Sequence, residues 1–207
     1  MLLLPAILSA CLHRELPVML TVIGDGEDRV ALEQACRAAG VAHLVTFGGL
    51  QPDTAVYQAM QSHHVLLFPS THREGLGLVL LEAQANGCVP VASHFPGVTD
   101  YAIADGETGL LAAVGDPDAF AAQIAALTLA DRWQRYSHAG IERAGRLFSF
   151  AEMGRQYGGL ATAIGQGAYP LPTPRSQTAD RLPRFSRRDH LPRALLPLAA
   201  RLRRLFR

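Results

Sequence analysis

Short apolar runs alternate with helix-like stretches along most of this chain. The run Val65-Leu66-Leu67-Phe68 is apolar throughout, which is typical of a strand buried on both faces of a parallel sheet. Strands that alternate with helices at this spacing favour right-handed βαβ units. We therefore predict a Rossmann-like α/β fold, in which helices cover both faces of a parallel sheet. The predicted strands span residues 18–23, 43–47, 65–68, 89–92 and 110–112.

The helix-like stretches have recognisable ends. Gly40 follows the second of them, where a left-handed cap is needed, and Pro52 and Asp53 begin the third. Four of the five predicted strands are thus followed by a helix, as is typical of a parallel sheet. The predicted helices span residues 6–15, 28–39, 52–62, 78–86, 117–129, 131–148 and 150–164.

The sequence changes in character after Ile164. Residues 1–169 hold 9 arginines and 16 carboxylates, whereas residues 170–207 hold 10 arginines and 2 carboxylates, and the chain contains no lysine. The second part is also rich in proline. We predict a globular domain over residues 1–164 and a Pro/Arg-rich linker with a basic helix over residues 165–207.

The end of the chain, residues 191–207, has the periodicity of a basic amphipathic helix. Such a helix after a flexible linker can lie on an anionic membrane surface. The alternatives are that it packs on a partner protein or is unfolded. The composition, with 49% hydrophobic and 18% charged residues, is that of a soluble protein. No apolar run approaches the ~20 residues of a membrane-spanning helix. We predict a cytoplasmic protein with no nucleic-acid partner, and a peripheral position at the inner membrane face through residues 191–207 is one of these alternatives.

Cysteine usage favours a reducing compartment. The chain has three cysteines, Cys11, Cys36 and Cys88, all within apolar patterns and none with metal-ligand spacing. The run Leu8-Ser9-Ala10-Cys11 is similar to a lipoprotein signal. However, no positive region precedes it and the sequence continues directly into the first predicted strand. A buried amphipathic helix is the preferred interpretation, and no metal site is predicted.

Ligands of open parallel sheets bind beyond the carboxyl ends of the strands. Four segments follow predicted strands in this way and are candidate walls of one cleft. They are residues 24–26, 47–49, 69–77 and 93–99.

Two glutamates flank one of these segments. Glu74 precedes Gly75 and Gly77, which leave room for close approach of the backbone to a ligand. The helix that follows directs free N–H groups towards the cleft and favours a phosphate. Glu82, a little over one turn into this helix, can accept two hydrogen bonds from ribose hydroxyls. Taken alone, Glu82 is more simply a solvated helix residue, and Glu74 is more simply an acid in the first turn that interacts favourably with the helix dipole. Together with the glycines they suit a nucleotide sugar, which has phosphates between two polyols.

These residues belong to longer stretches with a clear resemblance. The stretches closely resemble the carboxyl-terminal domain of the retaining glycosyltransferases of family 4, which have the GT-B fold and a Glu-x7-Glu motif. The resemblance covers about residues 3–164. It is carried by "FPSTHREGLGLVLLEAQANGCVPVAS", "PGVTDYAIADGETGLLAAVGD", "VIGDGEDRVALEQACRAAGV" and "VTFGGL".

The resemblance implies a role for each motif residue. Glu74 would be the catalytic-site residue that contacts the transferred sugar, and Glu82 would bind the ribose of the donor. The reaction would be retaining glycosyl transfer from a nucleoside-diphosphate sugar, without a metal or other cofactor, because the helix dipole and cations stabilise the leaving group. The other substrate-binding residues would be Gly75, Leu76, Gly77 and Leu78 at the diphosphate and Gly24, Phe47 and Gly48 near the base.

The sequence departs from the family in three respects. Only the second of the two GT-B domains is present. The Arg and Lys that the family supplies to the diphosphate from the start of this domain are absent. Pro96-Gly97-Val98-Thr99-Asp100 replaces the usual Gly-Gly-x-x-Glu segment. Because charge stabilisation contributes several kcal/mol to such a reaction, we expect this chain to bind a donor weakly and to need a further domain for transfer.

Two interpretations remain open. In the first, the chain is a fragment or one half of a glycosyltransferase, and a separate chain supplies the amino-terminal domain. In the second, it is a non-catalytic module with a nucleotide-sugar fold that docks through its basic tail. A dehydrogenase is excluded because Gly24-Asp25-Gly26-Glu27-Asp28-Arg29 lacks the third glycine and its acids would repel a pyrophosphate.

Overall fold

The computed structural model describes residues 3–72 and 75–168. The chain divides into two units, residues 1–157 and 158–207. The domain boundary after residue 164 stays a prediction, and the amphipathic helix predicted for residues 191–207 lies outside the described residues.

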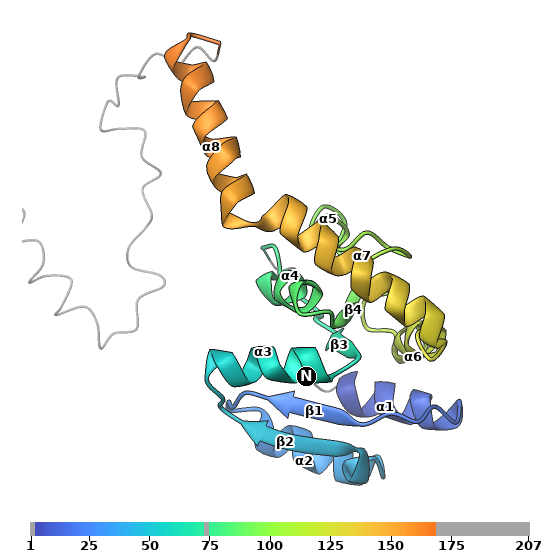
Figure 1. Cartoon of the computed structure of the whole chain (residues 1–207). Helices are drawn as coiled ribbons and strands as arrows, with labels where there is room; N and C mark the ends of the chain where they lie inside the picture. Colours follow the sequence, from blue (N-terminus) through green and yellow to red (C-terminus); the bar gives the residue numbers. More distant parts are fainter. Residues whose placement is uncertain (1–2, 73–74, 169–207) are drawn as a thin grey trace, which may run out of the picture. The chain divides into compact units, whose positions relative to one another are not determined.

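Helices and strands alternate along the described chain (Figure 1), as the sequence predicts except for the short helix between β4 and β5, which was not predicted. The strands are β1 (Leu20–Ile23), β2 (Val45–Gly49), β3 (Val65–Phe68), β4 (Val89–Ser93) and β5 (Leu110–Ala112). The helices are α1 (Leu3–His13), α2 (Arg29–Ala38), α3 (Asp53–Ser62), α4 (Leu78–Ala85), α5 (Thr99–Ala102), α6 (Pro117–Ala126), α7 (Ala130–Phe148) and α8 (Phe150–Gly165).

All paired strands are parallel, but they form two sheets. The first has the order β1-β2 and the second has the order β3-β4-β5. Figure 1 shows β1 and β2 as a pair apart from β3 and β4. The predicted Rossmann-like α/β fold is therefore confirmed, and its parallel ladder is interrupted between β1 and β3.

Side-chain alternation along β3 places helices on both faces of the strands. Val65 and Leu67 pack against the core formed with α1, α6, β4 and β5. Leu66 packs in the opposite direction, against α3 and α4. Because successive residues of a strand point to opposite faces, α1 and α6 cover one face and α3 and α4 cover the other.

β3 is less buried than the sequence predicts. All four residues of β3 are half-buried, whereas all five residues of β4 and all three of β5 are fully buried. The exposure of β3 comes from one edge of the strand, because helices cover both of its faces. One edge of β3 pairs with β4, and β3 borders a cavity instead of a further strand.

Local turns shift the first two strands relative to their predictions. Residues 42–44 form a 3-10 turn, which includes residues 43 and 44 of the predicted second strand, and β2 begins at Val45. Val18 donates its backbone N–H to Leu16 O at 2.9 Å, so that β1 begins at Leu20. Gly40 has φ +72°, which confirms the predicted left-handed end of the second helix.

The apolar amino-terminal stretch is a buried amphipathic helix, as predicted. Ile7 and Cys11 of α1 are fully buried against α6 and the second sheet. Leu4 and Leu8 pack instead with α2 and the first sheet. Helix α1 thus packs against both sheets. Among residues 3–72 and 75–168, no helix is both long and apolar enough to cross a membrane.

Candidate functional site

A cavity lies between the two sheets and opens at the carboxyl ends of β1 and β3. Its volume is about 750 Å³. At this end it is lined by Ile23 and Gly24 after β1 and by residues 68–72 after β3. The sequence places a ligand at this edge of the sheet, and two of the four predicted wall segments contribute to the cavity.

A second cavity of about 330 Å³ adjoins the turn after β1. It is lined by residues 22–29, Leu32 and Phe47, and it shares Gly24 with the larger cavity. The parallel register sets Val22 beside Phe47 and Ile23 beside Gly49. The structure therefore brings Gly24, Phe47 and Gly48 together, as predicted for the wall near the base, while their role stays a prediction.

Gly24 has a conformation that L side chains rarely adopt. Its φ is +123°, and its N–H donates to Gly49 O at 2.7 Å. A β-carbon at Gly48 would stand 3.6 Å from Val22 O, which is ordinary contact. Gly24 is thus needed for the backbone geometry of this turn, whereas Gly48 is not fixed by crowding.

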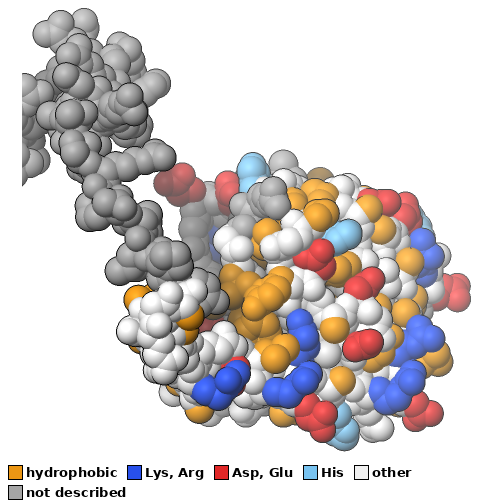
Figure 2. Space-filling model, turned by 90° about the horizontal axis from the view of Figure 1, so that it is seen from above, with side chains coloured by type: hydrophobic (Ala, Val, Ile, Leu, Met, Phe, Trp, Pro, Cys, Tyr) orange, Lys and Arg blue, Asp and Glu red, His pale blue; other side chains and the backbone are white. Residues whose placement is uncertain are grey.

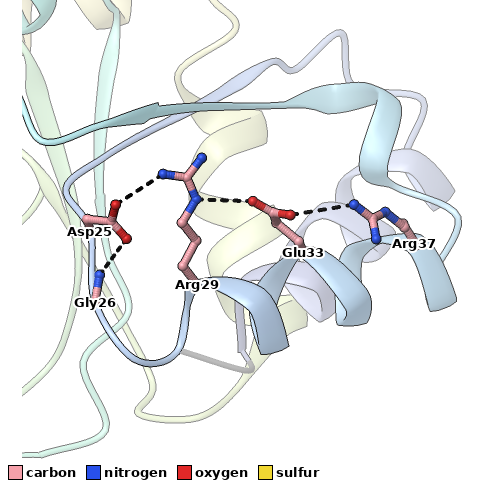
Figure 3. A network of polar contacts seen from close by, with 5 residues as sticks. All are labelled: Asp25, Gly26, Arg29, Glu33 and Arg37. Atoms are coloured by element: carbon pink, nitrogen blue, oxygen red, sulfur yellow. Dashed lines mark hydrogen bonds and ion pairs between the residues drawn. The ribbon is translucent and has the colours of Figure 1, made fainter.

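Arg29 organises the acidic turn beside this second cavity (Figure 3). Its guanidinium contacts Asp25 Oδ2 at 3.3 Å and Glu33 Oε1 at 3.1 Å, and Glu33 in turn contacts Arg37 at 3.5 Å. The guanidinium also lies over the Phe47 ring, 5.8 Å from its centroid. The hydrogen bond to Glu33, with the nearby carboxylate charges, raises the pKa of Arg29. Arg29 therefore compensates part of the negative charge of the turn, which also holds the carboxylates of Glu27 and Asp28.

Sequence reasoning missed Arg29 and read this turn as acidic. The signal was available, because Asp25, Arg29, Glu33 and Arg37 follow one another at i, i+4 spacing, where helical side chains of opposite charge pair. Gln51, which donates to Gly48 O at 2.7 Å, was also missed. Gln51 lines the larger cavity, but its position in a loop left no pattern in the sequence.

The start of α4 depends on Gly77. Gly77 is the N-cap residue with φ +69°, and no described side chain caps this helix end. A β-carbon at Gly77 would stand 3.0 Å from Leu80 Cδ1 and 3.8 Å from Phe68 Cζ. The backbone conformation therefore favours glycine, and a β-carbon would also require the Leu80 side chain to move by a few tenths of an ångström. Free N–H groups at such an end attract an anion.

The other predicted diphosphate residues have different surroundings. Leu76 packs against the core formed by α4 and β5, and Leu78 is 65% exposed. Gly75 is exposed, and nothing lies within 4 Å of the β-carbon it lacks. Gly75 and Leu78 thus lie at the surface at the start of α4 and Leu76 is partly buried, while their role at a diphosphate stays a prediction.

Glu82 is half-buried in the second turn of α4. Its backbone oxygen accepts a 2.9 Å hydrogen bond from Asn86 Nδ2, but its carboxylate has no polar partner among the described residues. Neither cavity is lined by Glu82 or by residues 75–78. Glu74, the predicted catalytic residue, lies outside the described residues.

The loop after β4 is held by a buried threonine. Thr99 Oγ1 accepts from Phe95 N at 2.8 Å and donates to Ser93 O at 2.9 Å. Asp100, which stands where the family has glutamate, is exposed and lies 3.8 Å from His94 Nε2. This fourth predicted wall segment lines neither cavity.

Charges are mixed on the face of the molecule that Figure 2 shows. On the face shown in Figure 2, arginine and carboxylate side chains are interspersed and form no patch of one sign. Within residues 3–72 and 75–168, no group of three or more His, Cys, Asp or Glu side chains could hold a metal ion. The prediction that no metal is needed is not tested by this observation.

Comparison with known proteins decides the family. The description of the family called "Glycosyl transferases group 1" matches residues 4–143, which include both cavities and α4. The chain belongs to the group 1 glycosyltransferases.

Curated glycosyltransferases are identical to this chain at about a third of the aligned residues. The lipopolysaccharide core biosynthesis glycosyltransferase LpsE of Rhizobium meliloti is 37% identical over 107 residues, 52% of this chain and 30% of that protein. The D-inositol 3-phosphate glycosyltransferase of Segniliparus rotundus is 33% identical over 134 residues, 62% of this chain and 29% of that protein. The chain thus spans less than a third of the length of these relatives.

Solved structures match the fold over a larger share of the chain. Anabaena HepE in complex with UDP and glucose superimposes with a TM-score of 0.66 and 23% identity, over 76% of this chain and 44% of HepE. Sucrose-phosphate synthase from Thermosynechococcus elongatus gives a TM-score of 0.65 and 26% identity, over 79% of this chain and 42% of that protein. The group 1 glycosyltransferase described here therefore corresponds to one half of a GT-B fold.

Proposed function

We propose that this chain is the donor-binding half of a retaining glycosyltransferase of family 4, which binds a nucleoside-diphosphate sugar. The observation that carries the proposal is the position of the larger cavity. It opens at the carboxyl ends of β1 and β3, where Rossmann-like folds bind nucleotides. Family membership and the UDP in the HepE structure support the same ligand class.

Each end of the donor has a candidate partner in this proposal. The diphosphate is stabilised by the uncapped N-terminus of α4, where Gly77 removes the β-carbon. The unpartnered carboxylate of Glu82 accepts hydrogen bonds from the ribose hydroxyls. Glu74 contacts the transferred sugar, and the base lies near Gly24, Phe47 and Gly48. No metal takes part, because the helix end and cations of the complete enzyme balance the leaving diphosphate.

Catalysis requires the acceptor site of an amino-terminal domain. The relatives in solved structures are more than twice as long as the matched part. In this proposal the chain acts with such a domain, on the same polypeptide or on a partner, in glycosyl transfer to an acceptor.

Calorimetric titration with UDP and with UDP-glucose tests the two glutamates separately. Glu82→Ala should weaken both ligands by the same factor, roughly 10-fold to 100-fold, because it removes hydrogen bonds to a charged acceptor in the part that both share. Glu74→Ala should weaken UDP-glucose alone, because only that ligand carries the sugar.

Glu142→Ala is the matched control, since it removes an exposed carboxylate from α7 without touching either cavity. Its affinities should equal those of the unmodified chain. Equal affinities for Glu82→Ala and Glu142→Ala would contradict the ribose assignment. Absence of binding to UDP, GDP and ADP sugars at millimolar concentration would contradict the proposed function.

A further inference from the structure

One glutamine is buried in the helix that begins after Gly77. Gln84 of α4 is 2% exposed, and the other buried residues of α4, Leu80 and Ala83, are apolar. A buried polar side chain destabilises the folded state unless its hydrogen bonds are made. The contacts of Gln84 therefore indicate why a polar residue occupies this position.

The amide of Gln84 links α4 to α5. Its Nε2 donates to Leu80 O in the same helix and to Ala102 O at the end of α5, each at 3.0 Å. Rotating the amide by half a turn would set Oε1 against these two carbonyl oxygens, so the network fixes which atom is the donor. Oε1 is buried and has no hydrogen-bond partner among the described residues. The glutamine thus leaves one buried acceptor unpaired while its nitrogen holds α5.

Helix α7 leaves room for this side chain and makes a second contact with α5. A β-carbon at Gly140 would stand 3.3 Å from Gln84 Cγ, which is a tight contact. Arg143, three residues further along α7, donates through Nη2 to Tyr101 O at 2.7 Å. The last carbonyl groups of a helix have no partner within it. Two consecutive carbonyl groups at the end of α5, those of Tyr101 and Ala102, therefore accept hydrogen bonds from two other helices.

Helix α5 in turn holds the loop that follows β4. Thr99, the first residue of α5, donates through Oγ1 to Ser93 O at 2.9 Å and accepts from Phe95 N at 2.8 Å. Residues 93–98 are therefore bonded to β4 at one end and to α5 at the other. Because Gln84 bonds α5 to α4, the loop and α4 form one hydrogen-bonded unit.

Both parts of this unit lie at the edge of the sheet where the donor is proposed to bind. The register pairs Phe68 with Ala92, so the segments after β3 and β4 leave neighbouring strands at the same edge. The segment after β3 leads into Gly77 and the start of α4, and Glu82 lies two residues before Gln84. A shift of α4 relative to α5 would thus move the helix start and the Glu82 carboxylate together.

We propose that Gln84 is a positioning residue for nucleotide binding. It ties α5 to α4, with Arg143 in support, so that the start of α4 and the loop after β4 keep one relative position. The inference rests on the proposed function. Gln84 acts through α4 and not by contact with the nucleotide, because its side chain is directed at α5 and α7. Its unpaired Oε1 fits this role, since departures from local packing rules concentrate at functional sites.

Titration of the 207-residue chain with UDP, GDP and ADP, beside urea unfolding, tests this inference. Gln84→Met keeps an unbranched side chain of similar size and removes the hydrogen bond to Ala102 O. It should weaken the nucleotide that the unmodified chain binds most tightly by roughly threefold to tenfold, the equivalent of one buried hydrogen bond. The amides of residues 99–103 should also exchange with solvent faster, since α5 loses a contact.

Ser137→Ala is the matched control. Ser137 Oγ donates to Gly87 O at 2.7 Å, so this substitution also removes a side-chain bond to a backbone carbonyl beside α4, but none to α5. It should lower stability by an amount similar to that of Gln84→Met, and leave nucleotide affinity and the exchange of residues 99–103 unchanged.

Arg143→Met is a second variant, at a side chain that is only half-buried. It removes the hydrogen bond to Tyr101 O and should weaken nucleotide binding as Gln84→Met does. If Gln84→Met does not fold, the affinity of Arg143→Met decides the test.

Three results would overturn the inference. The first is an unchanged affinity in Gln84→Met, or in Arg143→Met where the other variant is unfolded. The second is a loss of affinity in Ser137→Ala equal to that in Gln84→Met, which would leave Gln84 a purely structural role. The third is equal exchange of residues 99–103 in Gln84→Met and the unmodified chain. Absence of binding of all three nucleotides to the unmodified chain would instead contradict the proposed function, and the inference with it.

Discussion

At the scale of single residues, glycines set the geometry of the candidate site, and they do so for different reasons. Gly77 combines φ +69° with a β-carbon position 3.0 Å from Leu80, whereas Gly97 combines φ +75° with open space. Gly75 has neither constraint. Gly77 of this Gly-x-Gly pattern is therefore favoured by the structure itself. Gly75 is not, so its lack of a side chain is available for close approach of a ligand.

Alanine substitution should separate these reasons. Gly97→Ala should cost about 1–2 kcal/mol of unfolding free energy from backbone conformation alone. Gly77→Ala should cost more, because Leu80 must also move, and Gly75→Ala should leave stability unchanged. Urea unfolding measures all three. An unfolding midpoint for Gly77→Ala equal to or above that of Gly97→Ala would refute the steric part of the argument.

At the scale of elements, α8 carries a local charge network in its first turns. Glu152 accepts hydrogen bonds from Arg155 at 2.6 and 2.8 Å and from Gln156 at 2.7 Å. These bonds, the one from Arg155 first, lower the pKa of Glu152 from 4.5 to about 2. Since no residue of α8 is buried, this network is a source of order for its first turns that does not depend on packing.

The lowered pKa of Glu152 predicts an acid-sensitive helix. A carboxylate whose pKa is depressed in the folded state stabilises that state above its unfolded pKa, and this contribution is lost as the pH falls through the folded value. The first turns of α8 should therefore lose order between about pH 4.5 and about pH 2. Amide and carboxyl NMR shifts of Glu152 and its neighbours report the change. Glu152→Gln should remove this pH dependence, and a titration midpoint near 4.5 in the unmodified chain would contradict the network.

The apolar pattern of β3 predicts what covers the faces of the strand but not what pairs with its edges. Its apolar run correctly predicts a strand covered by helices on both faces. The run carries no information about the two edges, because edge pairing uses backbone groups that every residue has. The half-burial of β3, and the cavity beside it, follow from which strands are neighbours.

At the scale of the whole molecule, the three thiols report on global stability. Cys11, Cys36 and Cys88 are 0%, 1% and 2% exposed. Burial raises the pKa of all three, that of Cys88 to about 12, and for Cys11 the charge of Arg14 opposes part of the effect. Because the thiolate is the reactive form, each thiol is protected from reagents in two ways: burial blocks access to the sulfur, and the raised pKa keeps it protonated.

A thiol reagent at mildly alkaline pH should therefore react with the three cysteines at one common slow rate, set by unfolding of the chain. All three should become reactive together as urea is added. Mass spectrometry of the labelled peptides distinguishes them, and the fully unfolded chain is the control for intrinsic reactivity. Faster labelling of Cys88, which lines the larger cavity, would show that the cavity opens without global unfolding and contradict the prediction.

The sequence by itself determined the classes of element, their order and the family. Apolar periodicity and the glycine at each turn are local properties, and these placed α2, α3 and α4 within a few residues of their observed bounds. The contiguous motif around Gly75 and Glu82 likewise identified the group 1 glycosyltransferases before any contact was known. Periodicity succeeds here because burial of one face depends on residue type alone.

Only the tertiary structure decided which backbone edges are paired and which charges compensate one another. The separation of β1 from β3, the cavity along them and the position of Arg29 over Phe47 all join residues distant in sequence. Edge pairing depends on backbone groups common to all residues, and charge compensation depends on distances that a linear sequence does not contain. For that physical reason the sequence identified the group 1 glycosyltransferase family, and the fold showed that a cavity lies between β1 and β3.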